Sequence, residues 1–188
     1  MADHVLDSRR QGLEEAFFAE ENARLLAQLR QQGAAADRTA AIRAATGLTD
    51  AKALAALASL EVTPETLGAF ALAPLVLVAW ADGTISAEER RAALQAAADS
   101  GIQEGTPARA LLESWLASPP GPALAKAWKE YAGALAATLD TAGRAALRTA
   151  TLGRARQVAE ATGGFLGLTS AVSEAERRML VDLEAALG

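Results

Sequence analysis

Apolar residues recur along this chain at the three- and four-residue spacing of amphipathic helices, without the strict alternation typical of strands. The most apolar stretch, residues 67–81, leads directly into Asp82-Gly83, and a new helical pattern begins at Ser86. Ala supplies much of the hydrophobic content, and Ala is the strongest helix former. The pattern predicts an all-α fold, a compact domain of about eight or nine helices.

The stretch from Val78 to Arg91 predicts a helix, a turn and a second helix. Ser86 followed by Glu89 fits a capping box, in which each side chain accepts a backbone N–H at the start of the new helix. Gly83 can adopt the positive φ that a tight turn often requires. We therefore expect Asp82-Gly83 to be the pivot between two packed helices.

This stretch has an echo near the end of the chain. Residues 85–91, Ile-Ser-Ala-Glu-Glu-Arg-Arg, recur as Val-Ser-Glu-Ala-Glu-Arg-Arg at residues 172–178. The Ser and the second acid keep their spacing, so both copies predict a capping box. The echo is consistent with two related helix–turn–helix units, starting at Asp82 and near Thr169, and equally with two helices that merely begin alike.

The first predicted helix, residues 6–32, carries two apolar lines on a largely polar surface. The lines contain residues at helical spacing, namely Leu6, Leu13 and Phe17 on one and Phe18, Leu25 and Leu29 on the other. Such a helix usually covers its own core, and the alternative is an exposed arm that docks a protein partner or a second copy of the chain. The residues predicted to contact a partner are Leu13, Phe17, Phe18, Leu25 and Leu29.

Glycine and proline divide the rest of the chain. Gly33 and the three alanines after it predict a break, which separates an N-terminal helical arm, residues 1–33, from a domain over residues 34–188. Thr63-Pro64 predicts a helix start, and Pro74 must kink or restart that helix because its ring removes a backbone hydrogen bond. Further helix starts are predicted at Thr49 or Asp50, Thr106, Thr141 and Ser173.

Aromatic residues flank the Ser-Pro-Pro-Gly-Pro loop predicted at residues 118–122. Trp115 precedes the loop, and Trp128 and Tyr131 follow it. Aromatic side chains around a helix hairpin usually form its packing core. The alternative is that they line an apolar pocket.

Charge and composition exclude several classes of function. The net charge is −5 and no basic run occurs, which argues against nucleic-acid binding. Cys is absent, which excludes disulfides and zinc–thiolate sites. Residues 67–81 are too short for a membrane span, which needs about 20 apolar residues, so we expect a buried core helix there. The N-terminus does not resemble a signal peptide, so we expect a cytoplasmic protein.

The central turn is similar to the second half of an EF-hand calcium loop. Asp82, Gly83 and Glu89 would take the fifth, sixth and twelfth positions, but Val78 and Trp80 would take the first and third and supply no carboxylate. A weaker Ca²⁺ or Mg²⁺ site at Asp82 and Glu89 needs an acid from elsewhere in the fold. The alternative is that Asp82 braces the turn while Glu89 closes the capping box. The second copy lacks the Asp-Gly, and we expect it to bind no metal.

Residues 79–90, Ala-Trp-Ala-Asp-Gly-Thr-Ile-Ser-Ala-Glu-Glu-Arg, follow an apolar helix and resemble the signature of tellurite-resistance TerB-like domains. The resemblance covers roughly residues 64–187, and its specific part is Ala81 to Glu89. It implies a bacterial, intracellular, α-helical module with metal-binding acids at Asp82 and Glu89. It also implies a link to stress-response or membrane-associated complexes.

Catalytic patterns are missing from the sequence. His4 is the only His, so a Ser–His–acid arrangement has no base near a core, and neither a nucleotide-binding loop nor a nucleophile elbow occurs. We expect a non-enzymatic, TerB-like interaction module with weak divalent-metal binding at the Asp-Gly turn. The alternative is a structural or oligomerising helical protein that uses its N-terminal arm and binds no metal.

Overall fold

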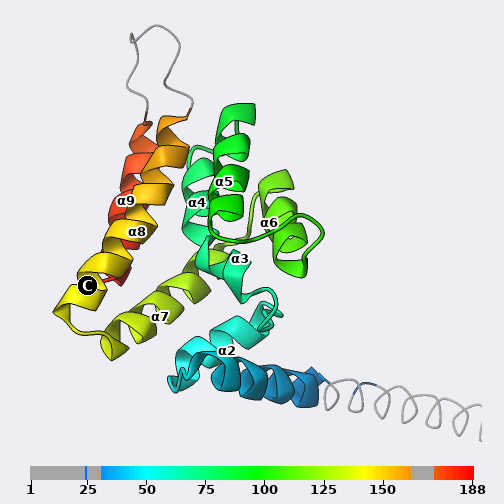
Figure 1. The fold of residues 1–188 in the computed structure, drawn as a ribbon. Helices are drawn as coiled ribbons and strands as arrows, with labels where there is room; N and C mark the ends of the chain where they lie inside the picture. Colours follow the sequence, from blue (N-terminus) through cyan, green and yellow to red (C-terminus); the bar gives the residue numbers. More distant parts are fainter. Residues whose placement is uncertain (1–23, 25–30, 162–171) are drawn as a thin grey trace, which may run out of the picture. The chain divides into compact units, whose positions relative to one another are not determined.

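The computed structural model describes residue 24, residues 31–161 and residues 172–188, and these residues form helices and no strand. The predicted all-α fold is therefore confirmed. The chain divides into residues 1–37 and a compact unit, Arg38–Gly188, which contains the labelled helices (Figure 1). After helical residues 31–46, the helices are α2 (Ala51–Ser59), α3 (Leu67–Ala71), α4 (Ala73–Ala79), α5 (Ala87–Asp99), α6 (Pro107–Ala117), α7 (Pro122–Thr138), α8 (Thr141–Glu160) and α9 (Glu174–Ala186).

Helix α4 lies at the centre of the compact unit. All of its residues are buried, and it packs against α3 and against every helix from α5 to α9. A helix that is apolar on all sides is stable only where other elements cover it completely. The prediction that residues 67–81 contain a buried core helix is confirmed. Among the described residues, no helix combines the length and the apolar character needed to cross a membrane.

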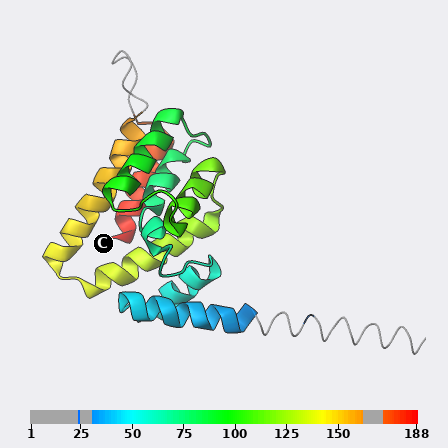
Figure 2. The ribbon, with the colours of Figure 1, turned by 45° about the vertical axis from the view of Figure 1, so that its right-hand side comes forward.

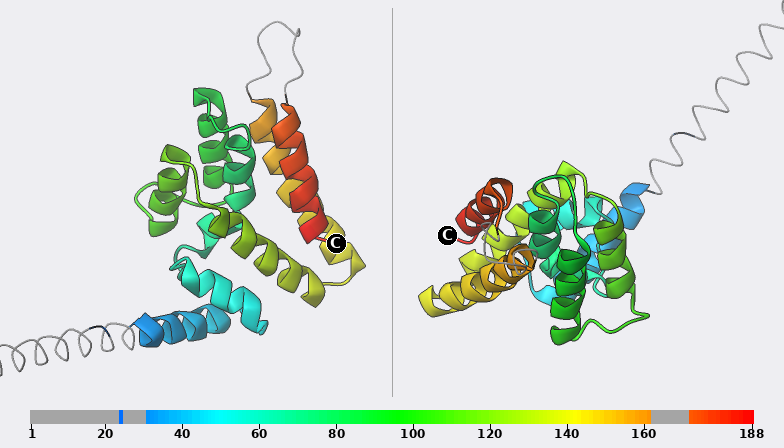
Figure 3. Two further views of the ribbon diagram at one scale, coloured as in Figure 1. Left: turned by 180° about the vertical axis from the view of Figure 1, so that it is seen from behind. Right: turned by 90° about the horizontal axis from the view of Figure 1, so that it is seen from above.

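The other helices pack in neighbouring pairs, and α2 joins the unit through α7. Helices α8 and α9 lie side by side and antiparallel, as Figure 2 and the rear view in Figure 3 both show. Helix α7 packs mainly against α2, and α6 packs against α3. The buried Arg109 also links α6 to α5, because its Nη1 donates to the Leu94 carbonyl at 3.1 Å while its Nε donates to Glu113 at 2.7 Å.

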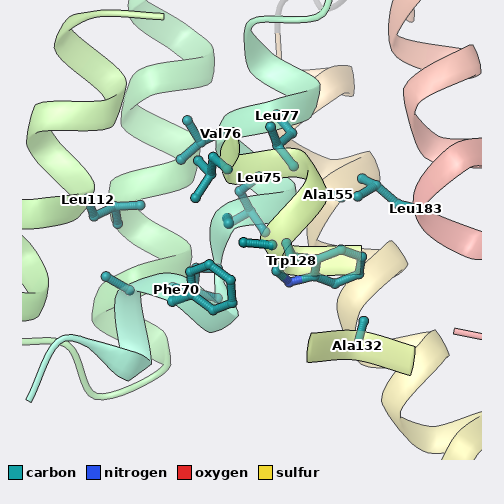
Figure 4. Packing of buried hydrophobic residues seen from close by; sticks show 14 of the residues in the cluster. Phe70, Leu75, Val76, Leu77, Leu112, Trp128, Ala132, Ala155 and Leu183 are labelled. Carbon is teal, nitrogen blue, oxygen red and sulfur yellow. The ribbon is translucent and has the colours of Figure 1, made fainter. Parts of the chain in front are cut away.

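The core is continuous across these pairs (Figure 4). Phe70 and Leu75 are fully or almost fully buried beside Leu112 of α6, and Trp128 of α7 is only 2% exposed. Leu183 brings α9 onto the same cluster. Burying a side chain of this size stabilises the fold by about 1.5–3 kcal/mol, so the shared cluster holds α4, α6, α7 and α9 together.

Two predicted helix boundaries are wrong. Residues 31–46 are helical without a break at Gly33, because Gly costs a helix only about 1 kcal/mol and three alanines follow it. Residues 64–66 form a turn, and α3 begins only at Leu67, because the Thr66 hydroxyl accepts the Thr63 N–H at 2.9 Å. The restart at Pro74 is confirmed, since α3 ends at Ala71 and Pro74 lies in the first turn of α4.

The proline loop does not join a packed helix hairpin. Helix α6 packs against α3, α4 and α5, whereas α7 packs against α2, α4, α8 and α9. The aromatic residues do belong to the core, as expected, because Trp128 is part of the buried cluster and Trp115 and Tyr131 pack against it. The expected hairpin of α6 and α7 is wrong. Trp80 instead reaches α6, because its indole N–H donates to the Trp115 carbonyl at 2.9 Å.

Candidate functional site

The Asp82-Gly83 turn has the predicted conformation. Helix α4 ends at Ala79, Gly83 has a φ of +91°, and α5 begins at Ala87. The Asp82 carboxylate is exposed, and its Oδ1 accepts the Thr84 backbone N–H at 3.0 Å and the Thr84 hydroxyl at 3.1 Å. This pattern is an Asx turn, in which the acid braces its own backbone.

Ser86 and Glu89 form the predicted capping box at the start of α5. The Ser86 Oγ accepts the Glu89 N–H at 3.0 Å. Glu89 Oε2 accepts the Ser86 N–H at 2.7 Å and the Ser86 hydroxyl at 2.8 Å. Three hydrogen bonds therefore fix the Glu89 carboxyl at the amino end of the helix, where the helix dipole favours negative charge.

The second copy of the motif forms the same structure at the start of α9. The Ser173 Oγ accepts the Glu176 N–H at 3.2 Å, and Glu176 Oε2 accepts the Ser173 N–H at 2.6 Å. Both capping boxes predicted from the echo are confirmed. The residues at Thr169 and Ser170, which replace the Asp-Gly, lie outside the described residues.

The two capping boxes meet inside the protein. Glu89 is 6% exposed and Glu176 is 4% exposed, and their carboxyl groups lie within hydrogen-bonding reach of each other. Glu176 Oε1 is buried, and among the described residues no hydrogen-bond donor reaches it. Two carboxylates offer only acceptors, so this contact needs a proton or another positive species between them.

The raised pKa of Glu89 indicates the same need for a proton or another positive species between the two acids. Burial raises the pKa of Glu89, and the adjoining Glu176 carboxyl raises it further, while the hydrogen bonds from Ser86 lower it. The net effect raises the pKa above the ordinary value of 4.5. Glu89 therefore holds its proton to higher pH than a solvated glutamate does, as expected for one member of a buried acid pair.

The predicted site residues fall into two different environments. Asp82 is exposed and braces the turn, whereas Glu89 is buried and closes the capping box. Their hydrogen bonds therefore show the roles given above as the alternative to a metal site: Asp82 braces the turn and Glu89 closes the capping box. Among the described residues, no group of three or more acids or histidines is placed to hold a metal ion.

Glu176 is the residue that sequence reasoning missed. It belongs to the copy of the motif that lacks the Asp-Gly, although it occupies the same capping-box position as Glu89. That shared position was the available signal, because a capping-box glutamate is held at the start of its helix in both copies. The predicted partner contacts Leu13, Phe17, Phe18, Leu25 and Leu29, like His4, lie outside the described residues.

Comparison with known proteins adds no assignment: no protein-family model, no curated protein and no solved structure matched this chain.

Proposed function

We propose that this chain is a non-enzymatic, TerB-like interaction module in which a divalent cation binds between Glu89 and Glu176. Among the described residues no donor reaches the buried Glu176 Oε1, which lies beside a second acid, and this is the observation that carries the proposal. The resemblance of residues 79–90 to TerB-like domains supports it, since that resemblance implies metal-binding acids at this turn.

The chemistry of the two acids suits a hard cation. Mg²⁺ commonly binds one or two protein carboxylates and keeps several waters, whereas Ca²⁺ takes about six to eight oxygen ligands. Each glutamate already uses Oε2 in its capping box, which leaves one oxygen on each side chain for a cation. This count favours Mg²⁺ over Ca²⁺. Asp82 has one oxygen engaged with Thr84 and is the less suitable ligand.

A proton meets the same electrostatic requirement and competes with the cation. Carboxylates must lose their protons before they bind metal, so cation affinity should rise as pH rises through the raised pKa of Glu89. The proposed role is structural: a bound cation would neutralise the acid pair and tie the start of α5 to the start of α9.

Isothermal titration calorimetry of the full chain with Mg²⁺, Mn²⁺ and Ca²⁺ at pH 6 and pH 8 tests this proposal. We expect saturable heat for Mg²⁺ or Mn²⁺ that is stronger at pH 8 and is lost in Glu89→Gln and in Glu176→Gln. Gln keeps a carbonyl oxygen for the capping box but removes the charge. Glu88→Gln is the matched control, because Glu88 is the exposed neighbour of Glu89 on the same turn.

The variants separate the possible results. Heat that survives in Glu176→Gln but is lost in Asp82→Asn would move the site to the turn and overturn the proposed pair. Absence of heat in the unmodified chain would reject the cation and leave the proton as the species that the pair shares.

A further inference from the structure

A small apolar cavity lies between the α3–α4 junction, α7, α8 and the end of α9, away from the acid pair. Its volume is about 130 Å³. The walls are mostly apolar and come from Leu72, Trp128, Leu135, Leu147 and Leu187. The remaining apolar wall residues are the alanines Ala71, Ala132 and Ala150, whose small side chains leave the space open.

The volume matches one six-membered ring. An apolar protein cavity of about 150 Å³ stays dry and takes up benzene, because water finds no hydrogen-bond partners there. Trp128 is 2% exposed and Leu187 is 1% exposed, so the deep walls are dry side chains of the core. The apolar part of this cavity, around Trp128 and Leu187, therefore favours an apolar group over water.

Three polar side chains, those of Tyr131, Thr151 and Arg154, also line the cavity. Within the described part of the chain, the Arg154 guanidinium forms no ion pair and the Tyr131 hydroxyl has no hydrogen-bond partner. The Tyr131 ring is held edge-on against Phe70, with centroids 5.6 Å apart and an interplanar angle of 79°. Burial raises the pKa of Tyr131, so its hydroxyl remains a neutral donor.

We propose that this cavity binds a small aromatic monocarboxylate of the size of benzoate. The ring would occupy the space between Trp128 and Leu147, and the carboxylate would meet Arg154. Among the described residues no acid pairs with Arg154, which lines this cavity, so its guanidinium is available to an anion. A guanidinium matches a carboxylate in shape and charge. This site goes beyond the proposed cation site and shares no residue with it.

NMR spectroscopy of the ¹⁵N-labelled full chain tests the site directly. The chain has three tryptophans, so it should give three indole N–H signals, and only Trp128 lines the cavity. We expect benzoate to shift the Trp128 indole signal in a saturable way and to leave those of Trp80 and Trp115 unchanged. Benzyl alcohol tests the ring without the charge, and acetate tests the charge without the ring. Each should bind at least about tenfold more weakly than benzoate.

Arg154→Met tests the role of the guanidinium. It should weaken benzoate binding about tenfold or more, because it removes the charged partner but keeps a long, helix-compatible side chain. Arg156→Met is the matched control: Arg156 is exposed on the same helix and does not line the cavity. Unchanged benzoate binding in Arg154→Met, an equal loss in Arg156→Met, or no saturable shift in the unmodified chain would each overturn the proposal.

Discussion

Replacing Glu176 by Gln should stabilise this protein at neutral and alkaline pH, although the change alters a buried capping residue. The Gln side-chain carbonyl can still accept the Ser173 N–H, as Glu176 Oε2 does at 2.6 Å. Its amide can then donate to Glu89, where the native Glu176 Oε1 has no donor among the described residues. The substitution therefore converts a contact between two acceptors into a hydrogen bond.

The expected gain in stability follows from the new hydrogen bond between the introduced Gln and Glu89. A hydrogen bond to a charged group contributes about 1.5–3 kcal/mol, and some of this is offset because Glu89 must keep its charge inside the protein. We expect a net gain of about 1–2 kcal/mol in the free energy of unfolding at pH 8. For a chain of this length, the gain corresponds to a rise of about 2–8 °C in melting temperature.

The gain should depend on pH in a definite direction. The pKa of Glu89 is raised in the folded protein, so the proton of the pair stabilises the native state fully below about pH 4.5. This stabilisation is lost as pH rises through the raised pKa. The variant retains its hydrogen bond without that proton, and its advantage over the native chain should therefore grow between pH 4 and pH 8.

Urea denaturation followed by circular dichroism at pH 4, 6 and 8 measures this dependence, with a chelator present to remove divalent cations. Glu174→Gln is the matched control, because it removes the same charge from the exposed first turn of the same helix. It should lose about 0.5 kcal/mol or less, since it breaks only an exposed ion pair with Arg178. A Glu176→Gln protein that is less stable than the native chain at pH 8, or equally stabilised at all three pH values, would refute the acid-pair reasoning.

Two other features give direct tests. Gly83→Ala should lower the free energy of unfolding by about 1 kcal/mol or more, because φ is +91° there although no atom lies within 4 Å of an added Cβ. Gly153→Ala, in open space on α8, should raise it by about 0.5–1 kcal/mol. Urea denaturation compares the two variants, and equal effects would remove the conformational explanation. If the apolar lines of residues 6–32 join two copies of the chain, Leu25→Glu with Leu29→Glu should convert a sedimenting dimer into a monomer. A native chain that already sediments as a monomer would exclude self-association through these residues.

Local features of the fold could be predicted from the sequence. The starts at Ser86, Thr106 and Ser173 depend on a side chain that bonds to a backbone group three residues away, so the necessary information lies within one turn. The boundary errors at Gly33 and Thr63 arose where weak local signals competed. One glycine did not outweigh three alanines, and the Thr66 hydroxyl favoured a turn before the helix.

The contact between Glu89 and Glu176 is a different kind of feature. The two residues lie almost half the chain apart, and their meeting depends on how α5, α8 and α9 pack around α4. The sequence shows that both residues close a capping box, but not that the boxes face each other. The same limit applies to the cavity: Trp128 and Tyr131 could be named as pocket or core residues, while Arg154 joins them only because α8 packs beside α7.

The long separation between the two acids also bears on the order of folding. Each capping box can form within its own helix as soon as that helix nucleates, but the acids meet only after the intervening loop of chain has closed. Their mutual repulsion therefore opposes the final docking of α9 and leaves the early growth of either helix unaffected. The protonation of one carboxyl would then govern how long the assembled bundle stays closed, rather than how quickly its parts first appear.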